Sequence, residues 1–432
     1  MSQQKQSSNI VAIIMMILLF GMISFVTNLA APMGVVLKNQ FGVSNAMGML
    51  GNMANFIAYA VMGIPGGLLL QKVGYKKTAL IAIAVGFLGV FIQYLSGYAG
   101  QSSAFVVYLL GAFVAGFSMC LLNTVVNPML NTLGGGGNKG NQLIQVGGSF
   151  NSIMATFTPA FVGILIGEAA KAKITDVFPV MYIAMGVFAL VFFVLWAVAI
   201  PEPNAERSSE PLGNLMSGAM KFRHFVLGAI AIFVYVGVEV GTPGTAILWL
   251  SDAKVSTIGV TTAGSIALTY WFLMFIGRLV GASIGNKVSS KTMLSVTSLV
   301  GLILVTLVIF SPTTSQVSLP LLQRSDTGAL SFGLSQVPIN AMFLVLIGLC
   351  TSIMWGGIFN LAVEGLGKYL AAASGIFMVL VCGGGILPWI QASVADHAGY
   401  LVSYWVIFLG LAYLLFYALI GSKNVNNDIK VD

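Results

Sequence analysis

The chain carries very little charge. Asp, Glu, Lys and Arg make up 7% of its 432 residues, and 58% of the residues are hydrophobic, whereas about 25% of the residues of a soluble protein are charged. A water-soluble surface cannot be built from so few charges, which excludes a soluble globular protein. The net charge of +7 does not indicate a nucleic-acid partner, because the basic residues are scattered and not interleaved with aromatic residues.

Cysteine and histidine are also scarce. The cysteines lie inside apolar runs and lack the spacing of a disulfide framework or a metal site; they are Cys120, Cys350 and Cys382. His224 and His397 have no acidic residues around them apart from Asp396. A polytopic membrane enzyme would need acids or a histidine at a membrane face, so this function is kept only as a remote alternative. We expect no metal and no cofactor.

Long apolar runs dominate the chain. A helix needs about 20 apolar residues to cross the roughly 30 Å hydrocarbon core of a bilayer. Six candidate spans precede the hydrophilic stretch 201–224 and six follow it. The spans are 10–36, 45–70, 77–98, 104–130, 142–167, 178–200, 225–250, 260–285, 291–311, 338–362, 370–395 and 400–421.

This pattern predicts an all-α membrane protein with twelve transmembrane helices in two pseudo-symmetric six-helix bundles. Residues 1–200 form the first bundle, 201–224 a cytoplasmic central loop, and 225–432 the second bundle with a short cytoplasmic tail. The stretch 312–337 is expected to be a long outer loop. A short repeat supports the two halves: Lys72-Val-Gly-Tyr-Lys76 and Lys287-Val-Ser-Ser-Lys291 each lie between two apolar runs, and internal repeats of this kind mark many secondary transporters.

The distribution of basic residues predicts the orientation. With the N-terminus inside, five of the 19 basic residues are outside, Arg278 is within a helix, and the remaining 13 (19 − 5 − 1) are cytoplasmic. This asymmetry is typical of the positive-inside tendency. We therefore expect a multi-pass membrane protein with both termini in the cytoplasm. The five outer residues are Lys38, Lys171, Lys173, Lys254 and Arg324.

Several short motifs recur in a characteristic order along the spans. They are Asn28 to Pro32, Asn127-Pro128, Ser149 to Ser152, Tyr235 to Glu239, Ser352 to Trp355, Ile358 to Leu361, Gly365 to Gly367 and Gly383 to Ile386. Together with the twelve spans and the basic turn at Lys72 and Lys76, they resemble the fucose and glucose/galactose permease branch of the major facilitator superfamily. The resemblance implies a sugar:proton symporter of a bacterial inner membrane.

The chain departs from this branch at several functional positions. Gln71 stands where the superfamily usually has an aspartate, and Ala31 and Asn123 stand where fucose members have acids linked to proton coupling. A glutamine of the fifth helix is replaced by Gly148, although Gln145 lies one turn earlier. Coupling to protons, coupling to sodium and uncoupled uniport therefore all remain open.

Glu239 is the only acid deep within an apolar span. A charge at the centre of a bilayer costs roughly 2.5 to 3.5 kcal/mol or more, so it is expected to face a cavity or a partner. We expect Glu239 to carry the proton and to contact the substrate. The alternative is a structural carboxylate held by hydroxyls or by Arg278. Arg278 itself is expected to be a gate or scaffold residue, with Glu364 at the cytoplasmic end of the tenth helix as its candidate partner; Lys72 and Lys76 are further gating charges.

Amides and aromatic residues inside the spans could recognise a sugar. An amide both donates and accepts hydrogen bonds, as sugar hydroxyls do, and an aromatic ring can stack on the C–H face of a pyranose. The alternative is interhelical hydrogen bonding and packing. The expected substrate-binding residues, besides Glu239, are Asn28, Asn123, Asn127, Gln145, Asn151, Tyr235, Trp355, Asn360 and Trp389.

The sequence thus predicts a secondary active transporter that moves a hexose or deoxyhexose, such as glucose, galactose or fucose, by alternating access. Its expected partners are the sugar, a coupling cation (a proton or sodium) and the lipid bilayer, and we expect a monomer. A sugar uniporter and efflux of another small polar metabolite remain alternatives.

Overall fold

The computed structural model describes residues 2–41, 50–166, 173–202, 211–252, 256, 258–324, 330–426 and 429. Within these residues the first half is built from α1 (Ser2–Phe41), α3 (Leu50–Val73), α4 (Tyr75–Leu95), α5 (Gln101–Leu133), α6 (Gly137–Ile166) and α7 (Phe178–Ala197). The second half contains α9 (Arg223–Ser251), α10 (Val260–Ile284), α11 (Ser290–Phe310), α12 (Ile339–Thr351), α13 (Met354–Val363), α14 (Leu370–Val379), α15 (Gly383–Ala398) and α16 (Tyr400–Phe416).

Twelve helical segments are long enough to cross a bilayer, because α12 with α13 and α14 with α15 each form one broken span. Eleven of them are also apolar enough by composition within the described residues. The twelfth, α6, has 30 residues, or about 45 Å at helical rise, but its first half is rich in amides. Helices satisfy every backbone hydrogen bond within one segment, which lipid demands. The predicted all-α fold with twelve transmembrane helices is confirmed.

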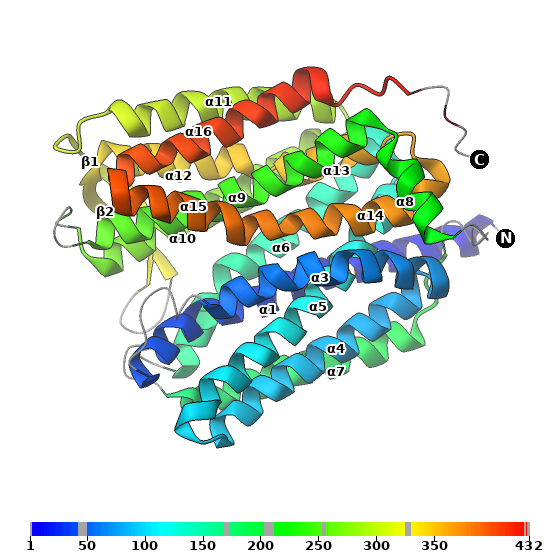
Figure 1. Ribbon diagram of the computed structural model, residues 1–432, viewed down its shortest axis with the longest axis horizontal. Helices are drawn as coiled ribbons and strands as arrows, with labels where there is room; N and C mark the ends of the chain where they lie inside the picture. The colour runs from blue at the N-terminus through cyan, green and yellow to red at the C-terminus, as the bar shows by residue number, and fades with distance from the viewer. Residues whose placement is uncertain are drawn as a thin grey trace.

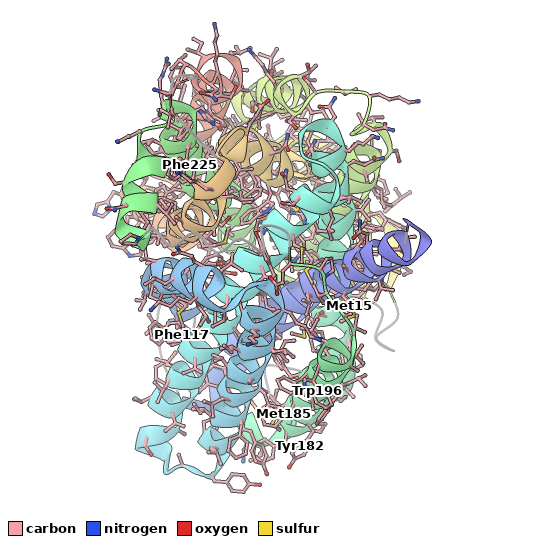
Figure 2. All side chains as sticks on the ribbon, turned by 90° about the vertical axis from the view of Figure 1, so that its right-hand side faces the viewer. Met15, Phe117, Tyr182, Met185, Trp196 and Phe225 are labelled. Carbon is pink, nitrogen blue, oxygen red and sulfur yellow. The ribbon has the colours of Figure 1, made fainter. Side chains whose placement is uncertain are left out.

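The helices gather into two bundles that lie one above the other in Figure 1. Both chain ends and the short helix α8 (Leu212–Met220), which lies in the predicted central loop, are on one side, here called the terminal face. The opposite side is called the hairpin face. Figure 2 looks onto the terminal face, with Phe225 in one bundle and Phe117, Met185 and Trp196 in the other. The bundle boundaries at residues 200 and 225 stay a prediction.

The bundles touch most extensively along two pairs of helices, α6 with α10 and α3 with α14. Glycines permit the closest approach. A Cβ on Gly375 of α14 would lie 2.8 Å from the Gly63 carbonyl oxygen and 3.0 Å from the Gly67 Cα. Side chains here would push the two backbones apart. The α3–α14 contact therefore depends on glycine at positions 63, 67 and 375.

The stretch expected to be an outer loop is a β-hairpin in its described part. Strands β1 (Gln316–Arg324) and β2 (Leu330–Pro338) pair antiparallel. The Leu322 amide donates to the Thr269 hydroxyl on α10 at 2.9 Å, and the Phe332 ring lies 5.5 Å from that of Phe272. The polar–apolar alternation from Gln316 onward is a strand signal that the prolines of this segment had obscured.

Candidate functional site

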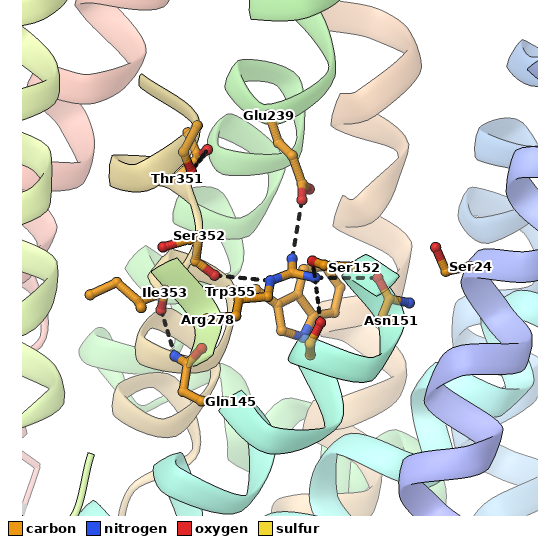
Figure 3. A network of polar contacts seen from close by, with 12 residues as sticks. Ser24, Gln145, Asn151, Ser152, Glu239, Arg278, Thr351, Ser352, Ile353 and Trp355 are labelled. Atoms are coloured by element: carbon orange, nitrogen blue, oxygen red, sulfur yellow. Dashed lines mark hydrogen bonds and ion pairs between the residues drawn. The ribbon is translucent and has the colours of Figure 1, made fainter. Parts of the chain in front are cut away.

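Arg278 lies at the centre of a polar cluster between the two bundles (Figure 3). Its Nη1 donates to three acceptors on α6: the Gly148 carbonyl at 2.9 Å, the Ser152 hydroxyl at 2.8 Å and the Asn151 Oδ1 at 3.3 Å. On its own side of the interface, Nε donates to the Ser352 carbonyl at 3.0 Å. Arg278 therefore joins helices of both halves through a single side chain.

The fifth contact of Arg278 is an ion pair with Glu239 on α9. The distance from Nη2 to Oε1 is 3.3 Å, and the two side chains are 7% and 14% exposed. A buried charge that loses its partner is strongly destabilising, by about 3–5 kcal/mol. Each charge therefore lowers the free-energy cost of burying the other.

The expected pairing of Arg278 with Glu364 is wrong for this structure. Arg278 is six residues before the end of α10 on the terminal face, which had suggested a partner at that face. Helical side chains point back toward the N-terminus of their helix, and α10 begins on the hairpin side. The guanidinium consequently reaches toward mid-membrane and meets Glu239. Glu364 is exposed, and its backbone carbonyl contacts His224.

The backbone of α9 is opened beside Glu239 by a proline. Pro243 lies inside α9 and has no N–H to donate to the carbonyl of residue 239. That carbonyl instead accepts a hydrogen bond from the Tyr270 hydroxyl at 3.2 Å, and Tyr270 also contacts the Thr351 hydroxyl at 2.9 Å. Tyr270 thus holds the turn that carries Glu239 against α10 and α12, a role that was not predicted from the sequence.

A second hydrogen-bonded chain crosses between the bundles through Trp355. The indole N–H of Trp355 on α13 donates to the Asn127 Oδ1 at 2.9 Å. The Asn127 amide donates to the Asn123 carbonyl at 2.9 Å, and the Asn123 amide donates to the Tyr59 hydroxyl at 2.8 Å. Trp355 also packs edge-on against Tyr235, with ring centroids 6.3 Å apart. Three predicted residues therefore form one hydrogen-bonded chain, Trp355, Asn127 and Asn123, to which the structure adds Tyr59, and Tyr235 packs against its end.

Further amides bridge the bundles between this level and the terminal face. Gln145 donates to the Ile353 carbonyl at 2.8 Å, and Gln142 donates to the Ala282 carbonyl at 2.9 Å. Asn131 donates to the Asn360 Oδ1 at 2.8 Å. The predicted Gln145 and Asn360 are thus interface residues here, and Asn131 was missed because nothing in the sequence says which amide it would meet.

Exposure divides the predicted substrate residues into two groups. Asn28, Asn151, Glu239 and Trp355 are only partly buried, whereas five are buried: Asn123, Asn127, Gln145, Tyr235 and Asn360. The Tyr235 hydroxyl is near the Glu239 carboxylate without reaching hydrogen-bond geometry. The partly buried group is the one that retains surface for a ligand, and the buried group is placed to support it.

Two predicted residues lie outside the cluster. Asn28 donates to the Ser24 carbonyl and hydroxyl on its own helix, at 2.8 and 3.1 Å, and Ser24 faces the cluster from the side of α1 (Figure 3). Trp389 on α15 is 65% exposed, and its contacts do not join it to Arg278 or Trp355. The structure therefore leaves a substrate role for Trp389 without support in this conformation.

The basic turn after α3 is tied to the start of the central loop. The Glu202 carboxylate accepts hydrogen bonds from the Tyr75 and Lys76 amides at 2.7 and 3.0 Å, at the N-terminus of α4, where a negative charge is favourable. Lys76 Nζ donates to the Trp196 and Val198 carbonyls at 2.9 and 2.6 Å. Lys72 is exposed. A gating role for the two lysines stays a prediction.

Replacing Asn127 with leucine is expected to destabilise the protein by about 1–3 kcal/mol, because the Trp355 N–H would lose its acceptor at the interface between the bundles. Thermal unfolding of the purified protein measures this. A double-mutant cycle with Trp355→Phe provides the control, since phenylalanine has no N–H to satisfy. Purely additive losses in the double variant would show that the Asn127–Trp355 bond contributes nothing.

Comparisons with known proteins identify the family to which this architecture belongs. The Major Facilitator Superfamily profile matches residues 13–389. The chain is 30% identical over 418 residues to the glucose/galactose transporter of Brucella abortus, covering 94% of this chain and 93% of that protein. It is 28% identical over 440 residues to a putative glucose/galactose transporter of Helicobacter pylori, covering 98% and 100%.

Solved structures share the fold. The crystal structure of the transporter FucP in the outward conformation superposes with a TM-score of 0.79 at 18% identity, covering 96% of this chain and 100% of FucP. A structure of the proton:xylose symporter XylE superposes with a TM-score of 0.67 at 13% identity, covering 94% and 95%. The chain therefore belongs to the Major Facilitator Superfamily, within its fucose and glucose/galactose permease branch.

Proposed function

We propose that this protein is a secondary transporter that carries a monosaccharide across the membrane by alternating access. The relatives named above as glucose/galactose transporters cover nearly the whole chain. The observation that supports the proposal most directly is the cluster itself, in which partly buried Asn151 from one bundle faces partly buried Glu239 and Trp355 from the other. An amide, an acid and an indole between two bundles suit a hydroxylated, ring-shaped substrate.

Alternating access would act on the bonds that cross the interface. Rocking the bundles apart at the terminal face would break the three bonds from Arg278 to α6. It would also separate Gln145 from Ile353 and Asn131 from Asn360. Glu239 and Ser352 belong to the same bundle as Arg278 and would move with it. We propose that the present conformation is the one closed at the terminal face.

Cation coupling is assigned to Glu239. Asn123, at the position where fucose members have an acid, is a neutral amide bonded to Tyr59 and Asn127, so it cannot exchange a proton at neutral pH. Glu239 is the acid that lies at substrate depth, and its only ionic partner in the described cluster is Arg278. A proton on Glu239 would replace that partner, which links protonation to the arrangement around Arg278. Sodium would have to use the same carboxylate.

We extend the proposal to the membrane topology and to the transport unit. Helix ends at the terminal face carry Lys76 at the start of α4, Lys221 after α8, Lys287 after α10 and Lys291 at the start of α11. Basic residues favour the cytoplasmic side. We therefore propose that this face lies on the cytoplasmic side of a bacterial inner membrane. The two halves of a single chain supply both sides of the cluster, and we therefore propose a monomer as the transport unit.

Counterflow into proteoliposomes tests the substrate class. Vesicles loaded with unlabelled glucose, galactose or fucose are expected to take up the matching labelled sugar transiently, because exchange needs only a carrier that binds on both sides. Protein-free vesicles give the background. If none of the three sugars, nor other neutral hexoses, exchanges above this background, the proposed substrate class is wrong.

A further inference from the structure

The centre of the cluster is electrically balanced by one pair of residues. Arg278 and Glu239 lie deep within their spans, whereas the other charged residues of the chain lie at or beyond the ends of the candidate spans. Their charges cancel at a separation of 3.3 Å. A substrate that enters beside them therefore meets no net charge from this pair.

The guanidinium is held in place independently of Glu239. Nε and Nη1 together donate to Ser352, Gly148, Asn151 and Ser152 at 2.8 to 3.3 Å, and only Nη2 points to the carboxylate. Removing the charge of Glu239 would leave Arg278 anchored by four bonds. Its Nη2 would then face the partly exposed position that the carboxylate had neutralised.

We propose that the Glu239 carboxylate is the residue that makes the site select neutral sugars and reject hexuronates. The proposal rests on sugar transport as the function. A hexuronate has the ring and hydroxyls of a hexose but a carboxylate at C6. In the wild-type site that carboxylate would meet Glu239 as a like charge, while Arg278 is already paired.

Removal of the glutamate charge inverts this selection. An uncompensated guanidinium in a low-dielectric site attracts an anion strongly, and guanidinium–carboxylate pairs are among the stronger and more geometrically specific hydrogen-bonded contacts. Rejection by a like charge is a common way in which sites gain specificity. The glutamine side chain has nearly the same shape as glutamate, so the change isolates the charge.

The test measures equilibrium binding of glucose, galactose, glucuronate and galacturonate to the purified full-length protein. For Glu239→Gln, the ratio of uronate to hexose affinity is expected to rise at least tenfold over the wild-type ratio. Asp396→Asn, an exposed site on α15 with the same change in net charge, is expected to leave the ratio unchanged. The double variant Glu239→Gln, Arg278→Gln removes both charges and is expected to return the ratio to the wild-type range.

An unchanged ratio in folded Glu239→Gln would overturn the proposal, and so would a raised ratio that persists in the double variant. Loss of all sugar binding in a folded Glu239→Gln protein would also contradict it. If Glu239→Gln does not give monodisperse protein, Glu239→Asn, which is also uncharged, supplies the same comparison. Failure of the wild type to bind either hexose is a separate result, which would reject the proposed function itself.

Discussion

Arg278→Leu is expected to abolish sugar uptake and to lower the thermal stability of the protein. The substitution leaves the Glu239 carboxylate 14% exposed at membrane depth without its partner. Removing one member of a buried ion pair costs about 3–5 kcal/mol, because the remaining charge is uncompensated. The bonds that Arg278 makes to α6 are lost as well. Thermal unfolding and counterflow on the same preparation measure both effects.

Two further variants separate charge from shape at this position. The double variant Arg278→Leu, Glu239→Leu has no uncompensated charge and is expected to recover most of the lost stability but no uptake. Arg278→Lys keeps the charge, but an ammonium cannot reproduce a planar fork that meets five acceptors, so an intermediate stability is expected. Wild-type stability in Arg278→Leu would mean that the pair is not a structural unit.

Gly375→Leu is expected to reduce uptake at least tenfold by a different route. A Cβ at this position would lie within 3.0 Å of the Gly67 Cα and 2.8 Å of the Gly63 carbonyl, and both atoms belong to backbone that cannot yield locally. The larger side chain would hold α3 and α14 apart and prevent closure at the terminal face. A carrier that cannot close one face cannot complete its cycle.

The state of that face can be read with a cysteine at Asn131, which is buried at the interface in the present conformation. In a background without the native cysteines, a membrane-impermeant thiol reagent should modify it faster in Gly375→Leu than in the parent when applied from the terminal side. Gly186→Leu on α7 is the matched control, because a Cβ there meets nothing within 4 Å. Equal labelling and uptake in both leucine variants would refute the proposed role of the α3–α14 contact.

The fold could be predicted from the sequence because the backbone of a chain in lipid must satisfy its hydrogen bonds internally, which restricts the structures that can span a membrane. Runs of about 20 apolar residues must be helices, and the hydrophilic stretch 201–224 separates six from six. The amide-rich α6 was found by its place in the pattern although its composition alone falls short. The hairpin was missed because its strands lie between the apolar spans, where no long apolar run marks them, and because Pro320 obscures the alternation of polar and apolar residues.

The residues that gather in the candidate site were easier to predict than the contacts between them. Glu239 was selected because an acid inside an apolar span is costly unless it has a partner or a function. The structure places it beside Arg278. The expected Arg278–Glu364 pair failed because residue counting ignores the direction and the length of an arginine side chain. Tyr59, Asn131 and Tyr270 were missed because their partners lie on other helices, and one sequence does not show which side chains of two helices meet.

The most direct test of proton coupling through Glu239 is pH-gradient-driven sugar uptake by the wild-type protein and by Glu239→Gln. Both proteins are reconstituted side by side and are also assayed by counterflow. The wild type is expected to accumulate sugar when the outside is acidified, and collapse of the gradient with a protonophore should abolish accumulation. Glu239→Gln is expected to retain measurable exchange but not to accumulate. Full gradient-driven accumulation by Glu239→Gln would contradict the assignment of coupling to this residue.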